Sequence, residues 1–191
     1  MQKPNEQKRR RILEEAARLF AEQPYHDVRL EDVAARAEVG KGTIYIYFPS
    51  KDELYLALVD QGFAQLVSEV GALAHDESLD ARVALRRIVA ALVHFAVEYP
   101  QLSELMRSTA GGTGTRWTKG RSDLTRVIEA VIRRGVKHKT LRDAHPELTA
   151  LCIPGLVRSV LLFGPRELDE RAVTRHLVRL LEHGLVREEE R

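Results

Sequence analysis

Residues 41–48 place a cation, a glycine, a hydroxyl and two tyrosines within one short segment. Ile44 and Phe48 are four positions apart, so a helix over this segment would turn both of them inward. The other side chains then lie on the open side or at its edges; they are Lys41, Gly42, Thr43, Tyr45 and Tyr47. Such a helix suits the major groove of DNA, where hydroxyl and aromatic groups meet base edges and where cations and tyrosines meet phosphates.

A second apolar stripe precedes this segment and predicts another helix. Its members recur at i, i+3, i+4 and i+7 and are Leu30, Val33, Ala34 and Ala37. The break Glu38-Val39-Gly40 separates the two helices, and Gly40 can act as the N-cap of the second. Residues 29–48 therefore predict a helix-turn-helix. The alternative is two ordinary amphipathic helices in a bundle, because this spacing also occurs by chance.

The identities of the residues in this region are more specific evidence than the spacing of its apolar residues. Val39-Gly40-Lys41-Gly42-Thr43-Ile44-Tyr45 and Tyr47-Phe48-Pro49-Ser50-Lys51-Asp52-Glu53-Leu54 closely resemble the DNA-binding signature of TetR-type transcriptional regulators, and the resemblance covers about residues 8–68. It implies that residues 41–48 form the recognition helix. It further implies that the side chains of Lys41, Gly42, Thr43 and Tyr45 face bases or the groove wall, whereas Tyr47 and Lys51 hold phosphates.

Three positions depart from the pattern of that family. Arg29 stands where a hydroxyl residue usually opens the second helix; it can reach a phosphate but cannot cap the helix. Glu38 stands where glycine is usual, and a positive φ there would cost a non-glycine residue about 1–2 kcal/mol. Gly40 replaces the usual serine cap. We therefore expect a strained turn at Glu38.

Composition describes an ordinary globular chain with a small basic surplus at one end. The 191 residues are 44% hydrophobic and 30% charged, which is typical of soluble domains. Residues 1–51 carry ten Lys/Arg against eight Asp/Glu, including Lys8-Arg9-Arg10-Arg11, and residues 52–191 carry twenty of each. The single cysteine, Cys152, excludes an intrachain disulfide and favours a reducing, cytoplasmic compartment. We expect neither a secretory signal nor a membrane partner, since the apolar run Leu148–Phe163 is too short to span a bilayer.

Helical periodicity over the whole chain predicts an all-α fold of about nine helices. They lie at about residues 7–22, 30–37, 41–48, 50–73, 79–99, 102–106, 122–137, 146–163 and 169–186. Residues 1–50 form the predicted DNA-binding domain, a three-helix bundle, and residues 51–191 the larger effector-binding and dimerisation domain. Ser50 and Glu53 form a capping box, worth about 1 kcal/mol, at the start of the fourth helix. Because this helix packs against both domains, we expect it to link them mechanically.

The last two predicted helices are apolar on more than one side. A helix that is apolar all round must be buried all round, and the chain has too few helices to cover both. We therefore expect a homodimer through about residues 146–163 and 169–186, as the resemblance also implies; the alternative is a central core helix within a monomer. A two-fold dimer would present its recognition helices about 34–36 Å apart, or a multiple of that, matching a palindromic site in double-stranded DNA.

The resemblance also implies a small-molecule pocket in the larger domain. The candidate lining residues are Phe63, Leu66, Leu92, Phe95, Leu105, Met106, Trp117 and Val127, and each of them is equally compatible with plain core. Arg158 differs, because a guanidinium within an apolar helix must be paired or reach water. It is either part of a salt bridge at the dimer seam or a counter-charge for an acidic effector.

No other constellation predicts chemistry, and we expect no metal, no cofactor and no enzymatic activity. The cluster Gly111-Gly112-Thr113-Gly114 with Lys119 lacks the order of a phosphate loop and a preceding strand. His176 and His183 have no third ligand at a suitable spacing. The sequence thus predicts a homodimeric, ligand-responsive regulator, a repressor released from a palindromic operator by a small-molecule effector. The alternative function is a helical protein-interaction module without specific DNA binding.

Overall fold

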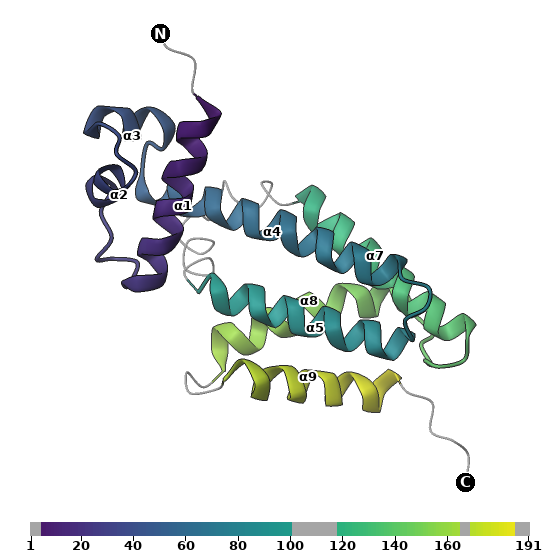
Figure 1. The fold of residues 1–191 in the computed structure, drawn as a ribbon. Coiled ribbons are helices and arrows are strands. Elements are labelled where there is room, and N and C mark those ends of the chain that lie inside the picture. The colour runs from purple at the N-terminus through teal and green to yellow at the C-terminus, as the bar shows by residue number, and fades with distance from the viewer. Residues whose placement is uncertain (1–4, 101–117, 165–168, 186–191) are drawn as a thin grey trace. The chain divides into compact units, whose positions relative to one another are not determined.

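The computed structural model describes residues 5–100, 118–164 and 169–185. Within these residues the chain forms eight α-helices and no strand (Figure 1). They are α1 (Glu6–Glu22), α2 (Leu30–Arg36), α3 (Lys41–Tyr47), α4 (Lys51–His75), α5 (Ala81–Glu98), α7 (Thr118–Lys137), α8 (Pro146–Phe163) and α9 (Glu170–Leu185). The predicted all-α fold is confirmed, and the sixth predicted helix lies outside the described residues. No helix in the described part is both long and apolar enough to cross a bilayer.

Contacts divide the chain into two compact units, residues 1–62 and 63–191, and the boundary falls within α4. In unit 1, α1, α2, α3 and the start of α4 enclose a small core. Its largest fully buried side chains are Ile12, Leu13, Val28, Val33, Ile44, Leu54 and Val59. Helix α2 packs on both α1 and α3, so the two helices of the predicted motif are held as one element.

In unit 2, α5 packs against α7, α8 and α9. Its core draws on five helices; it contains Leu66 and Val70 of α4, Ile88 and Leu92 of α5, Ile128 and Ile132 of α7, Ile153 and Val157 of α8, and Val173 and Leu177 of α9. The two residues from each helix are four positions apart, which is the helical periodicity on which the sequence prediction rested. The end of α4 is held by Arg134, whose guanidinium donates to the backbone oxygens of Ala74 at 2.8 Å and Asp76 at 3.0 Å.

The start of α7 was predicted too late. The sequence predicted this helix at about residues 122–137, but α7 begins at Thr118. Gly120 lies inside the helix against Phe63, and a Cβ at this glycine would lie 2.5 Å from Phe63 Cε1. Gly120 is therefore a packing glycine at a close helix contact rather than a linker glycine.

Candidate nucleic-acid interface

Helix α3 buries one side and opens the other. Ile44 is completely buried and Phe48 is 3% exposed, as the sequence predicted. The helix begins at Lys41 with Gly40 as its N-cap, and no side-chain hydrogen bond supports this cap. Gly42 faces open space, since a Cβ added there would meet nothing within 4 Å. The packing of the protein itself therefore does not require a glycine at position 42.

The turn between α2 and α3 confirms the strain predicted at Glu38. This residue has φ 51°. The backbone N–H of Val39 donates to Ala34 O at 2.9 Å and that of Glu38 to Ala35 O at 3.2 Å, which is the Schellman pattern with a left-handed residue after the helix. The Glu38 carboxylate also pairs with Arg11 of α1, with Arg11 Nη2 2.5 Å from Oε2. This exposed ion pair gives the glutamate a contact that glycine would lack.

Glu31 of α2 holds two side chains of α3 in place. Its Oε1 accepts from Lys41 Nζ at 3.0 Å and from the Tyr45 hydroxyl at 3.1 Å. The hydrogen bond from Lys41 lowers the pKa of Glu31, and the same bond raises the pKa of Lys41. The hydrogen bond to Glu31 raises the pKa of Tyr45. Sequence reasoning missed Glu31, because an acidic residue in a first helical turn is already explained by the helix dipole.

Tyr47 is half-buried on the other flank of α3. Its hydroxyl oxygen accepts from the backbone N–H of Asn5 at 2.8 Å. The side chain of Asn5 in turn caps α1 by accepting from Gln7 N at 2.8 Å. A phenolic hydroxyl that accepts one hydrogen bond keeps its own proton to donate, so this geometry leaves Tyr47 able to donate to a phosphate oxygen.

Lys51 has a structural role that the sequence did not predict. Its Nζ donates to Tyr25 O at 2.8 Å and to His26 O at 3.2 Å, and it lies 4.5 Å from the centre of the Tyr25 ring. A lysine ammonium has three N–H groups, so one remains for an anion. The predicted cap at the start of α4 is present, since Glu53 N donates to Ser50 Oγ at 3.1 Å.

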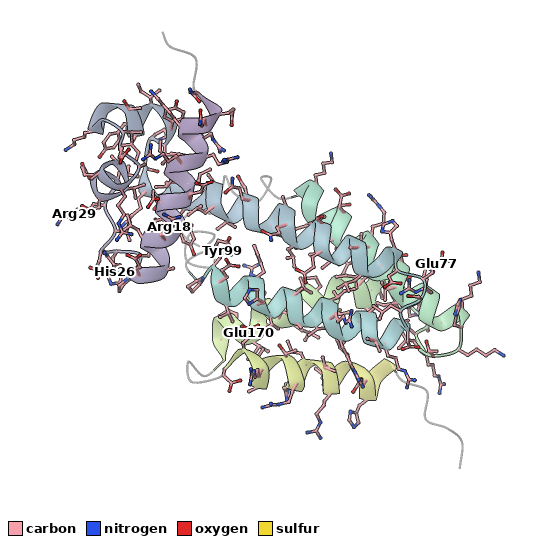
Figure 2. All side chains as sticks on the ribbon, viewed as in Figure 1. Arg18, His26, Arg29, Glu77, Tyr99 and Glu170 are labelled. Atoms are coloured by element: carbon pink, nitrogen blue, oxygen red, sulfur yellow. The ribbon has the colours of Figure 1, made fainter. Side chains whose placement is uncertain are left out.

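The other predicted DNA-contacting residues lie around this face. Arg29 is exposed at the N-cap of α2, makes no side-chain cap hydrogen bond, and extends away from the helices (Figure 2). Thr43 is half-buried. The arginines of the basic cluster on α1 are engaged within the protein: Arg9 lies over the Phe48 ring, Arg10 pairs with Glu14, and Arg11 pairs with Glu38.

Sequence reasoning also passed over Ile46. This side chain is 69% exposed on α3. The signal was available, because Ile46 lies on the side of the helix opposite Ile44 and Phe48. Tyr45 and Ile46 are the two exposed large apolar side chains in the described part of unit 1, and both belong to α3.

A second exposed face lies on α8 and α9 of unit 2. The outward apolar side chains are Leu148 at 54%, Leu151 at 60% and Phe163 at 78% exposed on α8, with Leu180 at 51% on α9. Cys152, Gly155 and Arg158 are exposed on α8 as well. Arg158 therefore reaches water on the same side of α8 as Leu151. The sequence prediction that α8 is apolar beyond its packed side matches these exposures.

The predicted pocket residues within the described chain belong to the unit 2 core or its margin. Leu66 and Leu92 are buried, and three more are partly buried against the core: Phe63, Phe95 and Val127. The Phe63 and Phe95 rings lie 5.7 Å apart, and Phe95 and Tyr99 lie 5.0 Å apart. Leu105, Met106 and Trp117 lie outside the described residues. Tyr99 joins this aromatic cluster although the sequence did not single it out.

A cavity of about 220 Å³ lies elsewhere, at the turn between α4 and α5. It is lined by polar groups, among them Ser78, Asp80, Arg134 and Thr140. Arg134, which lines this cavity, is also the residue whose hydrogen bonds to backbone oxygens hold the turn. We therefore assign the cavity to the architecture of the turn and not to the predicted pocket.

Comparison with known proteins agrees with the geometry of α2 and α3. Residues 12–58 match the family of bacterial regulatory proteins known as the tetR family. The DNA-binding unit of this chain is therefore of the TetR type. The matched residues span most of α1, the helix-turn-helix and the start of α4. Transcription regulation and DNA binding through a helix-turn-helix are properties of the family that this unit matches.

Relatives extend this match beyond the DNA-binding unit. The HTH-type transcriptional regulator YhgD of Bacillus subtilis is 29% identical over 148 residues, 73% of this chain and 74% of its own length. The HTH-type transcriptional activator FasR of Mycolicibacterium smegmatis is 36% identical over 92 residues, 48% of this chain and 42% of its length. The crystal structure of a transcriptional regulator from Saccharomonospora viridis in complex with choline has a TM-score of 0.75 at 28% identity, and the match covers 96% of this chain and 100% of that one.

Proposed function

We propose that this chain is a TetR-type homodimeric repressor that leaves a palindromic operator when a small-molecule effector binds. The observation that carries the proposal is the outward face of α3. Its inner side is locked by Ile44 and Phe48, and its outer side offers Lys41, Tyr45 and an unobstructed Gly42. The dimensions of the major groove accommodate a helix of this kind.

The contacts around α3 assign different tasks to its residues. Lys41, Gly42, Thr43 and Tyr45 lie at or beside the outward face and are proposed to meet bases or the groove wall. Phosphate contacts are proposed for Tyr47, Lys51 and Arg29, which surround this face. In support, Tyr47 and Lys51 each keep a donor group beyond the hydrogen bonds that hold them. Phosphate contacts fix the position of the protein, and base contacts select the sequence.

The proposed dimer covers the outward apolar face of α8 and α9 with a second copy of the chain. Leu148, Leu151, Phe163 and Leu180 are more than half exposed, and burying such side chains is favourable at about 25 cal/mol per Å² of apolar surface. Arg158 shares this face, which supports a place at the seam rather than inside a pocket. A two-fold pair would set the two α3 helices about 34–36 Å apart, or a multiple of that distance.

The effector is proposed to bind beside the aromatic cluster of unit 2. The candidate lining residues in the described part are Phe63, Leu66, Leu92, Phe95 and Val127, which lie in or against the unit 2 core; Leu105, Met106 and Trp117 are the sequence candidates beyond it. The complex of the Saccharomonospora viridis regulator with choline supports a small-molecule ligand. An effector that favours the conformation with badly spaced recognition helices lowers operator affinity, typically by about 1–3 kcal/mol. Helix α4 contributes residues to both units and is the proposed link.

Repression is proposed because it requires only occupancy of the DNA, whereas activation needs a further contact with the transcription machinery. The proposed location is accordingly the cytoplasm, on nucleoid DNA.

The test is binding of the purified protein to duplex DNA from upstream of its own gene, measured by fluorescence anisotropy over a range of salt concentrations. A regulator binds tightly with a steep salt slope, and a reporter gene is then repressed. A helical interaction module would show neither a palindromic preference nor a steep slope.

A further inference from the structure

The centre of the outward face of α3 is occupied by an apolar side chain. Successive residues of an α-helix are rotated by about 100°, so Ile46, two positions from both Ile44 and Phe48, points about 160° away from each of them. It is thus almost opposite the two side chains that anchor α3 in the core. Gly42 precedes Ile46 by four positions and shares the same outward row. Lys41 and Tyr45 lie on one flank of this row, and Thr43 and Tyr47 lie on the other.

Packing within the protein does not explain Ile46. Its side chain is 69% exposed, and a β-branched residue is a weaker helix former than leucine or lysine. Single exposed apolar residues are common on protein surfaces. Ile46 differs because it stands at the middle of the face that the proposed function assigns to DNA, in one row with a glycine that no internal contact requires.

We infer that Ile46 contacts the C5-methyl group of a thymine in the major groove and so selects A·T at one position of each half-site. This inference rests on the proposed function. An isoleucine side chain cannot hydrogen-bond to a phosphate or a base edge, and the thymine methyl is the apolar group that the major groove presents. With only a hydrogen atom at Gly42, the backbone of α3 approaches the groove closely, and the outward row carries Ile46 towards the bases.

The polar flanks orient the face for this contact. Glu31 holds Lys41 and Tyr45 at 3.0 and 3.1 Å, and the Asn5 backbone holds the Tyr47 hydroxyl at 2.8 Å. Both contacts tie α3 side chains to other helices of unit 1 or their ends. The face therefore approaches DNA with its flanks already placed, and Ile46 projects between them.

The test removes the contact from either side: the methyl group of the thymine in the DNA, or the side chain of Ile46 in the protein. The full-length protein first selects duplexes from a library with a random 40-base-pair region, and each thymine of the enriched duplex is then replaced in turn by uracil, which lacks only the methyl group. Affinities of the wild type and Ile46→Ala are measured for every duplex. Val97→Ala, which shortens an exposed apolar residue of unit 2 (43% exposed), is the matched control, and Ile46→Val tests whether a branched side chain suffices.

We expect uracil at one position in each half-site to weaken wild-type binding about fourfold per half-site, as burial of one methyl group predicts. Ile46→Ala should lose sensitivity to uracil at that position alone and keep its melting temperature. Equal uracil sensitivity of the wild type and Ile46→Ala, or a wild type insensitive to uracil at every position, would overturn the inference and leave the proposed function intact. Failure of the wild type to enrich any duplex would overturn both.

Discussion

The outward faces of α3 and α8 are both exposed, but they differ in chemistry and in how their side chains are held. On α3, Lys41 and Tyr45 are bound to Glu31 and Tyr47 to Asn5. On α8 the outward residues are Leu148, Leu151, Cys152 and Gly155, with Arg158 as the charged group among them; this face is mainly apolar. A face whose polar flanks are already held in position suits a charged partner such as DNA, whereas a mainly apolar face suits a second copy of the same chain.

The largest effect is expected from a charge placed on the α8 face. Leu151→Glu would bury a carboxylate at the proposed seam, at a cost of several kcal/mol, and should separate the dimer. Without a paired site, operator affinity should fall by roughly 10²–10⁴. Sedimentation velocity reports the mass and anisotropy the affinity. Val97→Glu puts the same charge at an exposed position of α5 and should change neither; if both variants stay dimeric, the α8 face is not the seam.

A methyl group added to the outward face of α3 is expected to lower DNA affinity without lowering the stability of the fold. Gly42→Ala meets nothing within 4 Å and should raise the free energy of unfolding by up to about 1 kcal/mol, because alanine favours a helix. It should nevertheless weaken operator binding about tenfold, or about 1.4 kcal/mol, by keeping α3 away from the groove. Gly71→Ala in α4, equally unobstructed, should stabilise the protein and leave DNA binding unchanged. Undiminished binding by Gly42→Ala would show that α3 does not approach DNA through this row.

Lys51 and Tyr45 sharpen the distinction between phosphate and base contacts. Lys51→Gln should weaken binding to operator and random duplexes by the same factor and reduce the salt slope by about 1. Tyr45→Phe removes the hydroxyl bound to Glu31 and should alter the preferred sequence at constant salt slope. Competition between operator and random duplexes at several salt concentrations measures both quantities. A sequence-dependent loss in Lys51→Gln would contradict its assignment to a phosphate.

The smallest effects concern two turns with the same backbone pattern, one in each unit. Lys139 after α7 has φ 61°, and its turn repeats the Schellman bonds, with Thr140 N donating to Gly135 O at 2.9 Å. Lys139→Gly should raise the free energy of unfolding by about 1 kcal/mol through relief of the positive φ. Glu38→Gly should raise it less, by about 0.5 kcal/mol, because the surface ion pair with Arg11 is lost. Chemical denaturation measures both, and a lower stability of Lys139→Gly would refute the strain argument.

Much of this architecture follows from local sequence. Periodicity located α8 from Pro146 to Phe163 as observed, and a turn position normally held by glycine predicted the positive φ of Glu38. Both depend on residues close together in the chain. The contacts of Glu31 could not be predicted in the same way. Its hydrogen bonds join surface side chains of two different helices, and such bonds produce no periodic pattern in the sequence. Gly120 was left outside the predicted helix, because sequence alone does not distinguish a glycine that makes room for a neighbouring ring from a loop glycine.

The central claim is that α3 enters duplex DNA with its outward face. Hydrogen–deuterium exchange of the full-length protein, with and without a duplex enriched from a random library, tests it residue by residue. The account predicts slower exchange on DNA binding at the backbone amides of residues 41–47 and at the start of α4 around Lys51, with α5 unchanged. Unchanged exchange throughout α3 in the presence of saturating duplex, together with protection confined to unit 2, would contradict it.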